Sequence, residues 1–234
     1  MAVPEVVAGL AAIPGVRTAA QLDDPASDTS SSAGSLPVAQ ALAGLVPNGL
    51  RRGSTVAVRG STALVLALLA EAMREGSWAA ITGMPEVGLV AAAELGVDLD
   101  RLALIPDPGA EVAAVLSALI DGFDLVVLGS AVARGIQSQL ARRLAGRVRN
   151  RGAVLLCAGQ WPGAELEVSV SSRRWRGLTD DGFGHLEFRD VVATSRGRGP
   201  AARPRKVALR LPGPDGAVAA VETSADRRLT EVAG

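Results

Sequence analysis

The chain has 234 residues, 48% of them hydrophobic, enough for one sizeable core. A single cysteine, Cys157, excludes an internal disulfide framework, and no apolar run approaches the roughly 20 residues of a membrane span. The N-terminus does not resemble a signal peptide, so we expect a cytoplasmic protein.

The net charge is zero, but the two signs are unevenly placed. Residues 1–139 hold 7 basic and 14 acidic residues, a net of −7, whereas residues 140–210 hold 15 and 6, a net of +9. This asymmetry predicts an acidic body with a basic region that meets nucleic acid or an acidic partner. The alternative is a set of solvated arginines.

The first predicted elements precede the core. Residues 4–13 (PEVVAGLAAI) could form a short amphipathic helix. Residues 23–35 (DDPASDTSSSAGS) contain no large apolar group and are expected to form a flexible linker. The ordered domain should therefore begin near Leu36.

From there strands alternate with helices. Strands are predicted at 55–59, 78–82, 102–105, 125–128 and 153–158, each a short continuous apolar run, and helices at 62–75, 87–95, 110–121 and 137–149. Repeated β-α units of this kind indicate a mainly parallel sheet flanked by helices, an α/β fold.

After Gly159 the pattern changes to short strands at 166–171, 186–194 and 206–211, with a possible last strand at 217–221. No long helix separates them, which predicts an antiparallel C-terminal extension at the sheet edge. Residues 195–205 (SRGRGPAARPR) are expected to form a long hairpin loop or a mobile arm, and the tail after Pro212 is expected to fray.

The joint between the first core strand and the following helix is Gly60-Ser61. A phosphate-binding joint of this type would read G-x-x-x-x-G-K-[ST], with backbone N–H groups and a lysine around the phosphates. If Gly60 is aligned with the first glycine, Val65 and Leu66 take the places of the second glycine and the lysine; if Thr62 is aligned with the loop threonine, Ser61 replaces the lysine.

The order of these parts resembles the RecA-like ATPase core over roughly residues 36–211. The resemblance is carried by residues 49–56 (GLRRGSTV), 71–76 (EAMREG), 91–104 (AAAELGVDLDRLAL) and 123–131 (FDLVVLGSA). It implies a metal-site aspartate where this chain has Gly129, and a catalytic glutamate near Met84. Phosphate cradle, magnesium ligand and water-activating carboxylate are therefore all missing, which predicts a protein without ATPase activity, cofactor or metal.

Within RecA-like proteins the chain resembles the ImuA family of bacterial mutasome accessory proteins, in particular the actinobacterial ImuA′ type, by its degraded nucleotide site and arginine-rich C-terminal segment. This resemblance implies a role in damage-induced translesion DNA synthesis. The implied partners are a catalytically inactive Y-family polymerase homologue of the ImuB type and, through it, an error-prone replicative-type polymerase. On this interpretation residues 1–35 form an N-terminal helix and linker, 36–195 the RecA-like core, and 196–234 a basic arm with a C-terminal strand or tail.

Two basic segments are the candidate contact residues for a partner or DNA: Arg173, Arg174, Trp175 and Arg176, and then Arg196, Arg198, Arg203, Arg205 and Lys206. Arginine neutralises phosphates while an indole stacks on an exposed base, but Trp and Arg are also common at protein interfaces. Capping of the sheet edge by Trp175 among solvated arginines is the third possibility.

Three other functions stay open on sequence grounds: a nucleotide-independent DNA-binding protein, an NTPase with an atypical site, and a cell-division inhibitor of the SulA type. A metal enzyme is disfavoured, since one histidine, His185, and one thiol cannot build a His/Cys metal site.

Overall fold

The computed structural model of the protein describes residues 34–179, 181–197 and 203–221. The helix expected at 4–13 and nearly all of the linker expected at 23–35 lie outside these ranges. The described chain begins with a hairpin that the sequence did not predict, in which β1 (Ser35–Leu36) pairs antiparallel with β2 (Leu50–Arg51). Between them, the 3₁₀ turn η2 (Gln40–Leu42) buries Leu42 completely.

A parallel sheet forms the centre of the fold because its strands are continuous apolar runs that can be covered on both faces. Its strands are β3 (Thr55–Arg59), β4 (Ala79–Thr82), β5 (Leu102–Ile105), β6 (Leu125–Leu128) and β7 (Val154–Cys157). They lie in the order β5-β4-β6-β7-β3. Numbered from β3 the order is 3-2-4-5-1, which differs from the dinucleotide-binding and flavodoxin-like orders.

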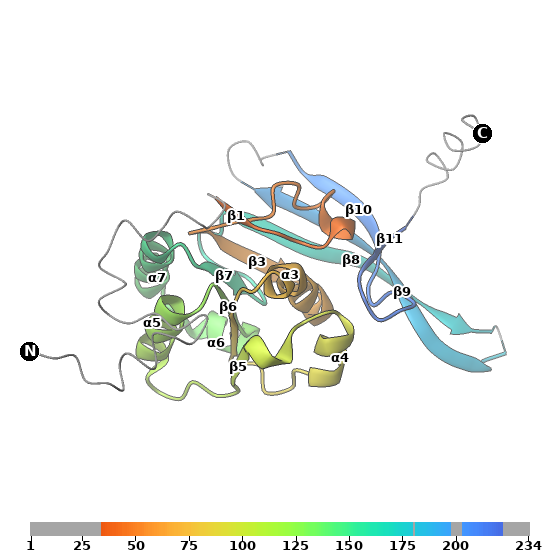
Figure 1. The fold of residues 1–234 in the computed structure, drawn as a ribbon, viewed down its shortest axis with the longest axis horizontal. Coiled ribbons are helices and arrows are strands. Elements are labelled where there is room, and N and C mark those ends of the chain that lie inside the picture. Colours follow the sequence, from red (N-terminus) through yellow and green to blue (C-terminus); the bar gives the residue numbers. More distant parts are fainter. Residues whose placement is uncertain (1–33, 180, 198–202, 222–234) are drawn as a thin grey trace, which may run out of the picture. The chain divides into compact units, whose positions relative to one another are not determined.

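Helices cover both faces of this sheet (Figure 1). They are α3 (Thr62–Arg74), α4 (Leu89–Glu94), α5 (Val112–Gly122), α6 (Ser130–Gly135) and α7 (Ser138–Arg151), with the 3₁₀ turn η3 (Leu99–Arg101) before β5. The sequence predicted α3, α4, α5 and α7 to within a few residues. It missed α6, whose six residues SAVARG are too few to show a helical apolar stripe.

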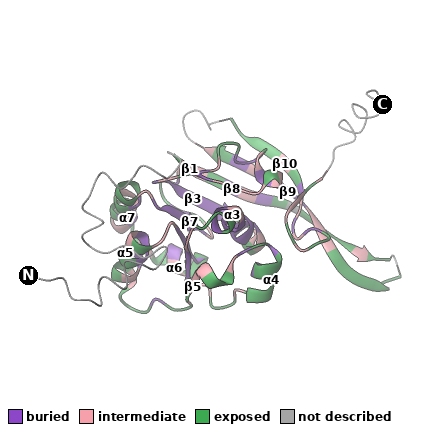
Figure 2. Cartoon of the chain, viewed as in Figure 1, coloured by how far each residue is buried: buried purple, intermediate pink, exposed green. Residues whose placement is uncertain are grey.

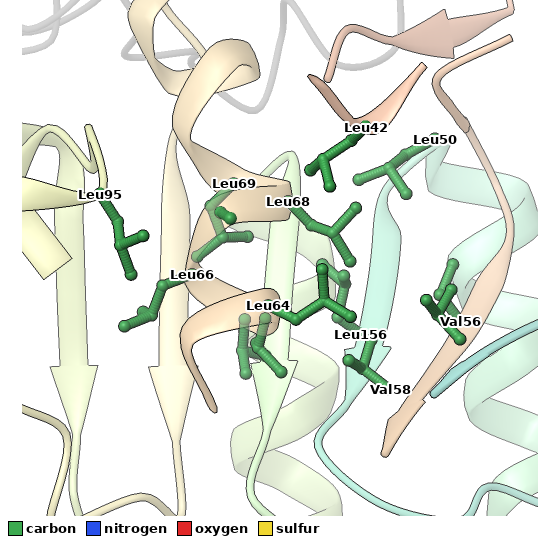
Figure 3. Close-up of a cluster of buried hydrophobic side chains, with 14 of the residues drawn as sticks. Leu42, Leu50, Val56, Val58, Leu64, Leu66, Leu68, Leu69, Leu95 and Leu156 are labelled. Carbon is green, nitrogen blue, oxygen red and sulfur yellow. The ribbon is translucent and has the colours of Figure 1, made fainter. Parts of the chain in front are cut away.

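Two hydrophobic cores lie on opposite faces of the sheet. The first joins α3, α4 and η2 to the sheet, and the second joins α5, α6 and α7 to it. Figure 3 shows Leu64 and Leu68 of α3 on the side of Leu156 and Val58, whereas Leu66 points towards Leu95. Burying each such leucine contributes roughly 1.5–3 kcal/mol. The buried centre and the exposed outer elements are visible in Figure 2.

Beyond β3 the sheet becomes antiparallel. It continues through β8 (Leu166–Leu178), β9 (Gly184–Gly197), β10 (Arg205–Arg210) and β11 (Ala219–Ala220). Only β8 as far as Ser169 pairs with β3, in parallel; β8 pairs antiparallel with β9, and β9 with β10. Past the last pair with β10 the hairpin continues as two strands, here called the ribbon (residues 175–189), which extends away from the other elements in Figure 1.

The predicted fold class is confirmed: an α/β fold with a mainly parallel central sheet, flanking helices and antiparallel C-terminal strands. The prediction stopped the strand now seen as β8 at residue 171, seven residues too early. Residues 173–176 (RRWR) are mostly charged and all exposed, so they lack the alternation of apolar and polar residues that marks a strand with one covered face.

Candidate functional site

The β3–α3 joint holds the place where a phosphate loop would lie, and its geometry is that of a tight structural link. Gly60 has φ +85°, in the region that favours glycine. The Ser61 side chain caps α3 by accepting a hydrogen bond of 3.2 Å from the Leu64 backbone N–H. Thr62 is the exposed first residue of the helix, and the Val65 and Leu66 that follow are buried in the first core. The apolar replacements therefore fill this position as core residues.

Two arginines of the antiparallel strands reach this joint. The Arg173 guanidinium donates to the Gly60 carbonyl oxygen, and Arg189 Nη2 lies 3.4 Å from Ser61 Oγ. Arg189 also donates through Nε to the Leu211 carbonyl (2.8 Å), and its guanidinium lies 5.3 Å from the centre of the Trp175 ring. The Gly60 carbonyl, the Ser61 hydroxyl and the Leu64 amide at the start of α3 therefore all contact other protein groups.

The electrostatics of Arg189 reflect this crowding. Burial lowers the pKa of the Arg189 guanidinium from its usual value, and the neighbouring charge of Arg173 lowers it further. Two cations without a carboxylate partner here would attract an anion, but both already donate to protein oxygens.

Gly129, at the position of the expected metal-site aspartate, leaves no room for a side chain. It follows β6 and its amide donates to the Thr82 carbonyl (2.8 Å). A β-carbon on Gly129 would lie 1.8 Å from the Gly83 carbonyl oxygen and 2.9 Å from Met84 Cγ. Gly83 and Met84 thus fill the space where a metal-binding carboxylate would project.

Met84 itself, near the expected catalytic glutamate, is half-buried and packs against the first core. Glu86, two residues further on, is exposed. The threonine at the end of β4, Thr82, is fully buried, and its hydroxyl has no hydrogen-bond partner among the described residues. The strand ends that carry catalytic groups in an ATPase therefore present glycine, methionine and threonine here.

The candidate contact residues are divided by the structure into two groups. Arg173, Arg174, Trp175 and Arg176 lie on the far half of β8, paired with residues 188–191 of β9. Arg196, Arg205 and Lys206 lie at the other end of β9 and the start of β10, with the exposed Arg203 just before β10. Along β9 the nearest members of the two groups, Arg173 opposite Val191 and Lys206 opposite Thr194, are three residues or roughly 10 Å apart. Arg198 lies outside the described residues.

Within each group the strands turn neighbouring side chains to opposite faces. Arg173 and Trp175 lie on the face of β8 that carries the buried Val191, whereas Arg174 and Arg176 lie on the other face, opposite Asp190 and Phe188. Arg205 and Lys206 are likewise on opposite faces. The nine predicted residues therefore do not form one continuous surface.

The ribbon carries exposed apolar side chains, of which sequence reasoning had singled out Trp175 alone. Trp175, Leu178, Phe183 and Leu186 are 45%, 53%, 75% and 51% exposed. Gly177 and Gly184 bring the two strands together at its tip, since a β-carbon on either would lie about 2 Å from a backbone oxygen of the opposite strand. Four large apolar groups on one two-stranded element favour contact with another protein.

Comparison with known proteins places this architecture in a family. Residues 44–163 match the family model described as the MT3502 N-terminal domain. A relative from Mycobacterium tuberculosis (strain ATCC 25618 / H37Rv), named "Uncharacterized protein Rv3395c", is 37% identical over 164 residues, which cover 66% of this chain and 80% of the relative. The chain belongs to the MT3502 family.

The MT3502 domain spans the β3–α3 joint, Met84 and Gly129, and ends before β8 begins. The ribbon and the second group of cations lie outside the residues matched by that domain. None of the helices in the described part of this MT3502-family chain is both long and apolar enough to cross a membrane.

Sequence reasoning also missed Arg189, which lies at the joint although it is distant from it in the chain. Equal strand lengths on both sides of the GLTDDGFG turn would have paired Trp175 with Leu186, whereas the hairpin, whose register shifts between Arg176 and Leu178, pairs it with Arg189. The described part of this turn is closed by hydrogen bonds from the Thr179 backbone and hydroxyl to the Phe183 carbonyl, both 2.8 Å long; Asp180 lies outside it.

Proposed function

We propose that this MT3502-family protein is a cytoplasmic, non-catalytic RecA-like accessory factor that assembles or stabilises an error-prone polymerase complex during damage-induced translesion synthesis. Its partners are an inactive Y-family polymerase homologue of the ImuB type and, through it, a replicative-type polymerase. The proposal rests on the resemblance of the sequence to ImuA-type proteins, and the packing at Gly129 and the apolar ribbon support it.

The observation that supports a non-catalytic role best is the packing at Gly129. An NTPase needs a carboxylate at the magnesium and a cradle for the phosphates. The Gly83 carbonyl and Met84 fill the first position, and Arg173 and Ser61 use the hydrogen-bonding groups of the second. Contacts within the protein thus take up both positions, which supports a non-catalytic role.

Calorimetric titration with ATP and Mg²⁺ tests this half of the proposal. We expect no heat of binding at micromolar protein concentration. A dissociation constant in the micromolar range would overturn the non-catalytic assignment.

The apolar ribbon supports the assembly half of the proposal. Interface anchors are large apolar or aromatic side chains that a partner can bury, and Phe183 and Leu186 are two of the four exposed apolar groups of the ribbon. We expect Phe183→Asp combined with Leu186→Asp to abolish co-purification with the polymerase homologue. Val90→Asp on α4, which replaces an equally exposed apolar group (75%), is the matched control and should leave the complex intact.

Two results would count against the assembly role. The first is that the wild-type protein fails to co-purify with the polymerase homologue. The second is that the ribbon variant and the Val90→Asp control bind it equally well, which would place the contact on another surface.

A further inference from the structure

One face of the antiparallel strands has no covering layer among the described residues. Val168, Val170, Val191, Ala193 and Leu209 of β8, β9 and β10 belong to the first core, beneath α3 and η2. The second core, under α5, α6 and α7, takes its strand residues from β3, β4, β6 and β7 and none from β8 to β10. The opposite face of β8, β9 and β10 therefore has no such layer; we call it the open face.

Strand register gives the membership of the open face. Residues directly opposite each other in paired strands share a face, and every second residue along a strand returns to it. The charged members, read from the pairs of β8 with β9 and of β9 with β10, together with the adjoining end of β3, are Arg59, Glu167, Arg174, Arg176, Asp190, Arg196, Lys206 and Arg210. Six of the eight are cations.

The two carboxylates of the open face are already engaged. Glu167 contacts Arg59 (3.3 Å) and lies opposite Arg196 in register, and Asp190 accepts from Arg176 (2.8 Å) and lies 3.6 Å from Arg210. Arg174, Arg196 and Lys206 are exposed and take part in no ion pair within the described ranges. The face keeps a net charge of about four positive units at neutral pH.

These cations form an elongated array. From Arg176, opposite Phe188, to Arg196 the face runs eight residues along β9, about 26 Å, and its three strands are about 10 Å wide. A flat strip of this kind matches a polyanionic chain better than a small anion, which would need an enclosed pocket.

The scarcity of apolar side chains on the open face favours a nucleic acid over a protein as its partner. Protein interfaces centre on buried aromatic or aliphatic anchors and deplete charge there. Here the one aromatic ring, Phe188, is covered by the Arg210 guanidinium at 4.6 Å, and the exposed anchors lie on the ribbon instead. Trp175 lies on the other face, so base stacking by that indole is not available to a strand on this one.

We propose that the open face binds the sugar–phosphate backbone of a nucleic acid strand, without nucleotide and without sequence preference. Arg174, Arg196 and Lys206 provide the uncompensated charges, and Arg59, Arg176 and Arg210 extend the array. This activity is separate from the docking of a protein by the ribbon, and either can fail without the other.

The test is fluorescence anisotropy of the full chain with a labelled single-stranded oligonucleotide of mixed sequence at increasing salt. Each phosphate neutralised on a single strand contributes about 0.7 to the slope of log affinity against log salt. Six contacts predict a loss of about 300-fold in affinity between roughly 50 and 200 mM salt, and four contacts a loss of about 50-fold.

Two charge-matched double variants locate the site. Arg196→Gln with Lys206→Gln removes two open-face cations and should reduce the salt dependence from about 300-fold to about 50-fold. Arg74→Gln with Arg205→Gln removes the same charge from the α3 helix and from the opposite face of β10, and should keep the wild-type slope. All four side chains are exposed, so neither pair should affect folding, which circular dichroism checks.

Three outcomes would overturn the proposal. The first is no binding by the wild-type protein at about 50 mM salt, where phosphate contacts are strongest. The second is an equal change of slope in both double variants, which would mean that net charge and not the open face matters. The third is binding of polyglutamate as tight as that of the oligonucleotide, which would assign the face to an acidic protein partner.

Discussion

Substituting Gly129 with alanine gives the sharpest test of how tightly Gly83 and Met84 fill the space beside Gly129. The backbone of Gly129 is extended, with φ −62° and ψ 149°, so an alanine there carries no conformational penalty. Only space opposes it: the β-carbon would lie 1.8 Å from the Gly83 carbonyl oxygen, 2.5 Å from its carbon and 2.9 Å from Met84 Cγ. Because two of these atoms are backbone, the strand ends of β4 and β6 must move apart.

Backbone shifts forced by one extra carbon cost about 1–3 kcal/mol. Because this overlap is severe, we expect Gly129→Ala to lower the free energy of unfolding by about 3 kcal/mol. For a protein of this size that is a fall in Tm of about 6–12 °C. Urea unfolding followed by far-ultraviolet circular dichroism measures it. The control is Gly146→Ala inside α7, where a β-carbon meets only Arg149 Nη2 at 3.9 Å and should stabilise the protein by about 0.5–1 kcal/mol.

An unchanged urea midpoint for Gly129→Ala, with the Gly146→Ala control behaving as expected, would refute the steric reasoning. It would mean that Gly83 and Met84 yield easily, so that a carboxylate could be housed there. If the steric reasoning holds, Gly129→Asp should lose at least as much stability as Gly129→Ala and gain no affinity for ATP and Mg²⁺.

Three further predictions concern stability and reactivity. A hydrogen bond from Arg147 and a second from Arg151 hold the pKa of Asp121 below its ordinary 3.8. Asp121→Asn should therefore lower the free energy of unfolding by up to about 1 kcal/mol above pH 3.8, and progressively less below it, as measured by urea unfolding against pH. Burial raises the pKa of the Cys157 thiol well above 9.0, so iodoacetamide should label this thiol only after unfolding. The free energy of unfolding should fall as the pH rises past 9.0, because only the unfolded thiol ionises. Labelling of the native protein, detected by mass spectrometry, would contradict the buried position. The buried Ser195 hydroxyl donates to the Leu45 carbonyl at 2.7 Å, so Ser195→Ala should lose about 1 kcal/mol in thermal unfolding, and no loss would mean that the η2 segment is not held by this bond.

The parallel core could be predicted closely because its strands are short, continuous apolar runs. The strands at 102–105 and 125–128 were predicted with the bounds that β5 and β6 show, although only β6 is buried throughout and β5 is a partly exposed edge strand. The β1–β2 hairpin could not be predicted, because two-residue strands carry no periodicity and their pairing depends on the tertiary contact of Leu42 with the core.

Around Gly129 the sequence indicated that no carboxylate is present, but not which groups fill the space. The absence of an aspartate at Gly129 can be read from the residues, whereas the approach of the Gly83 carbonyl depends on how β4 and β6 end side by side. The arginine cluster in β8 was seen as one group, yet the strand turns Arg173 towards Gly60 and Arg174 to the open face. A residue list without strand boundaries cannot separate these two roles.

The sheet that runs unbroken from β5 to β11 has a consequence for how fragments of this protein behave. The first core takes in Val168, Val191 and Leu209 as well as Val56 and Val58, so the antiparallel strands belong to the same folding unit as the parallel ones. The match to the MT3502 domain ends at residue 163, before any of those strands. A fragment cut at that boundary would leave one edge of β3 unpaired and strip part of the cover from α3. The end of the family match is therefore not a limit of autonomous folding, and expression of this protein should extend at least through β11.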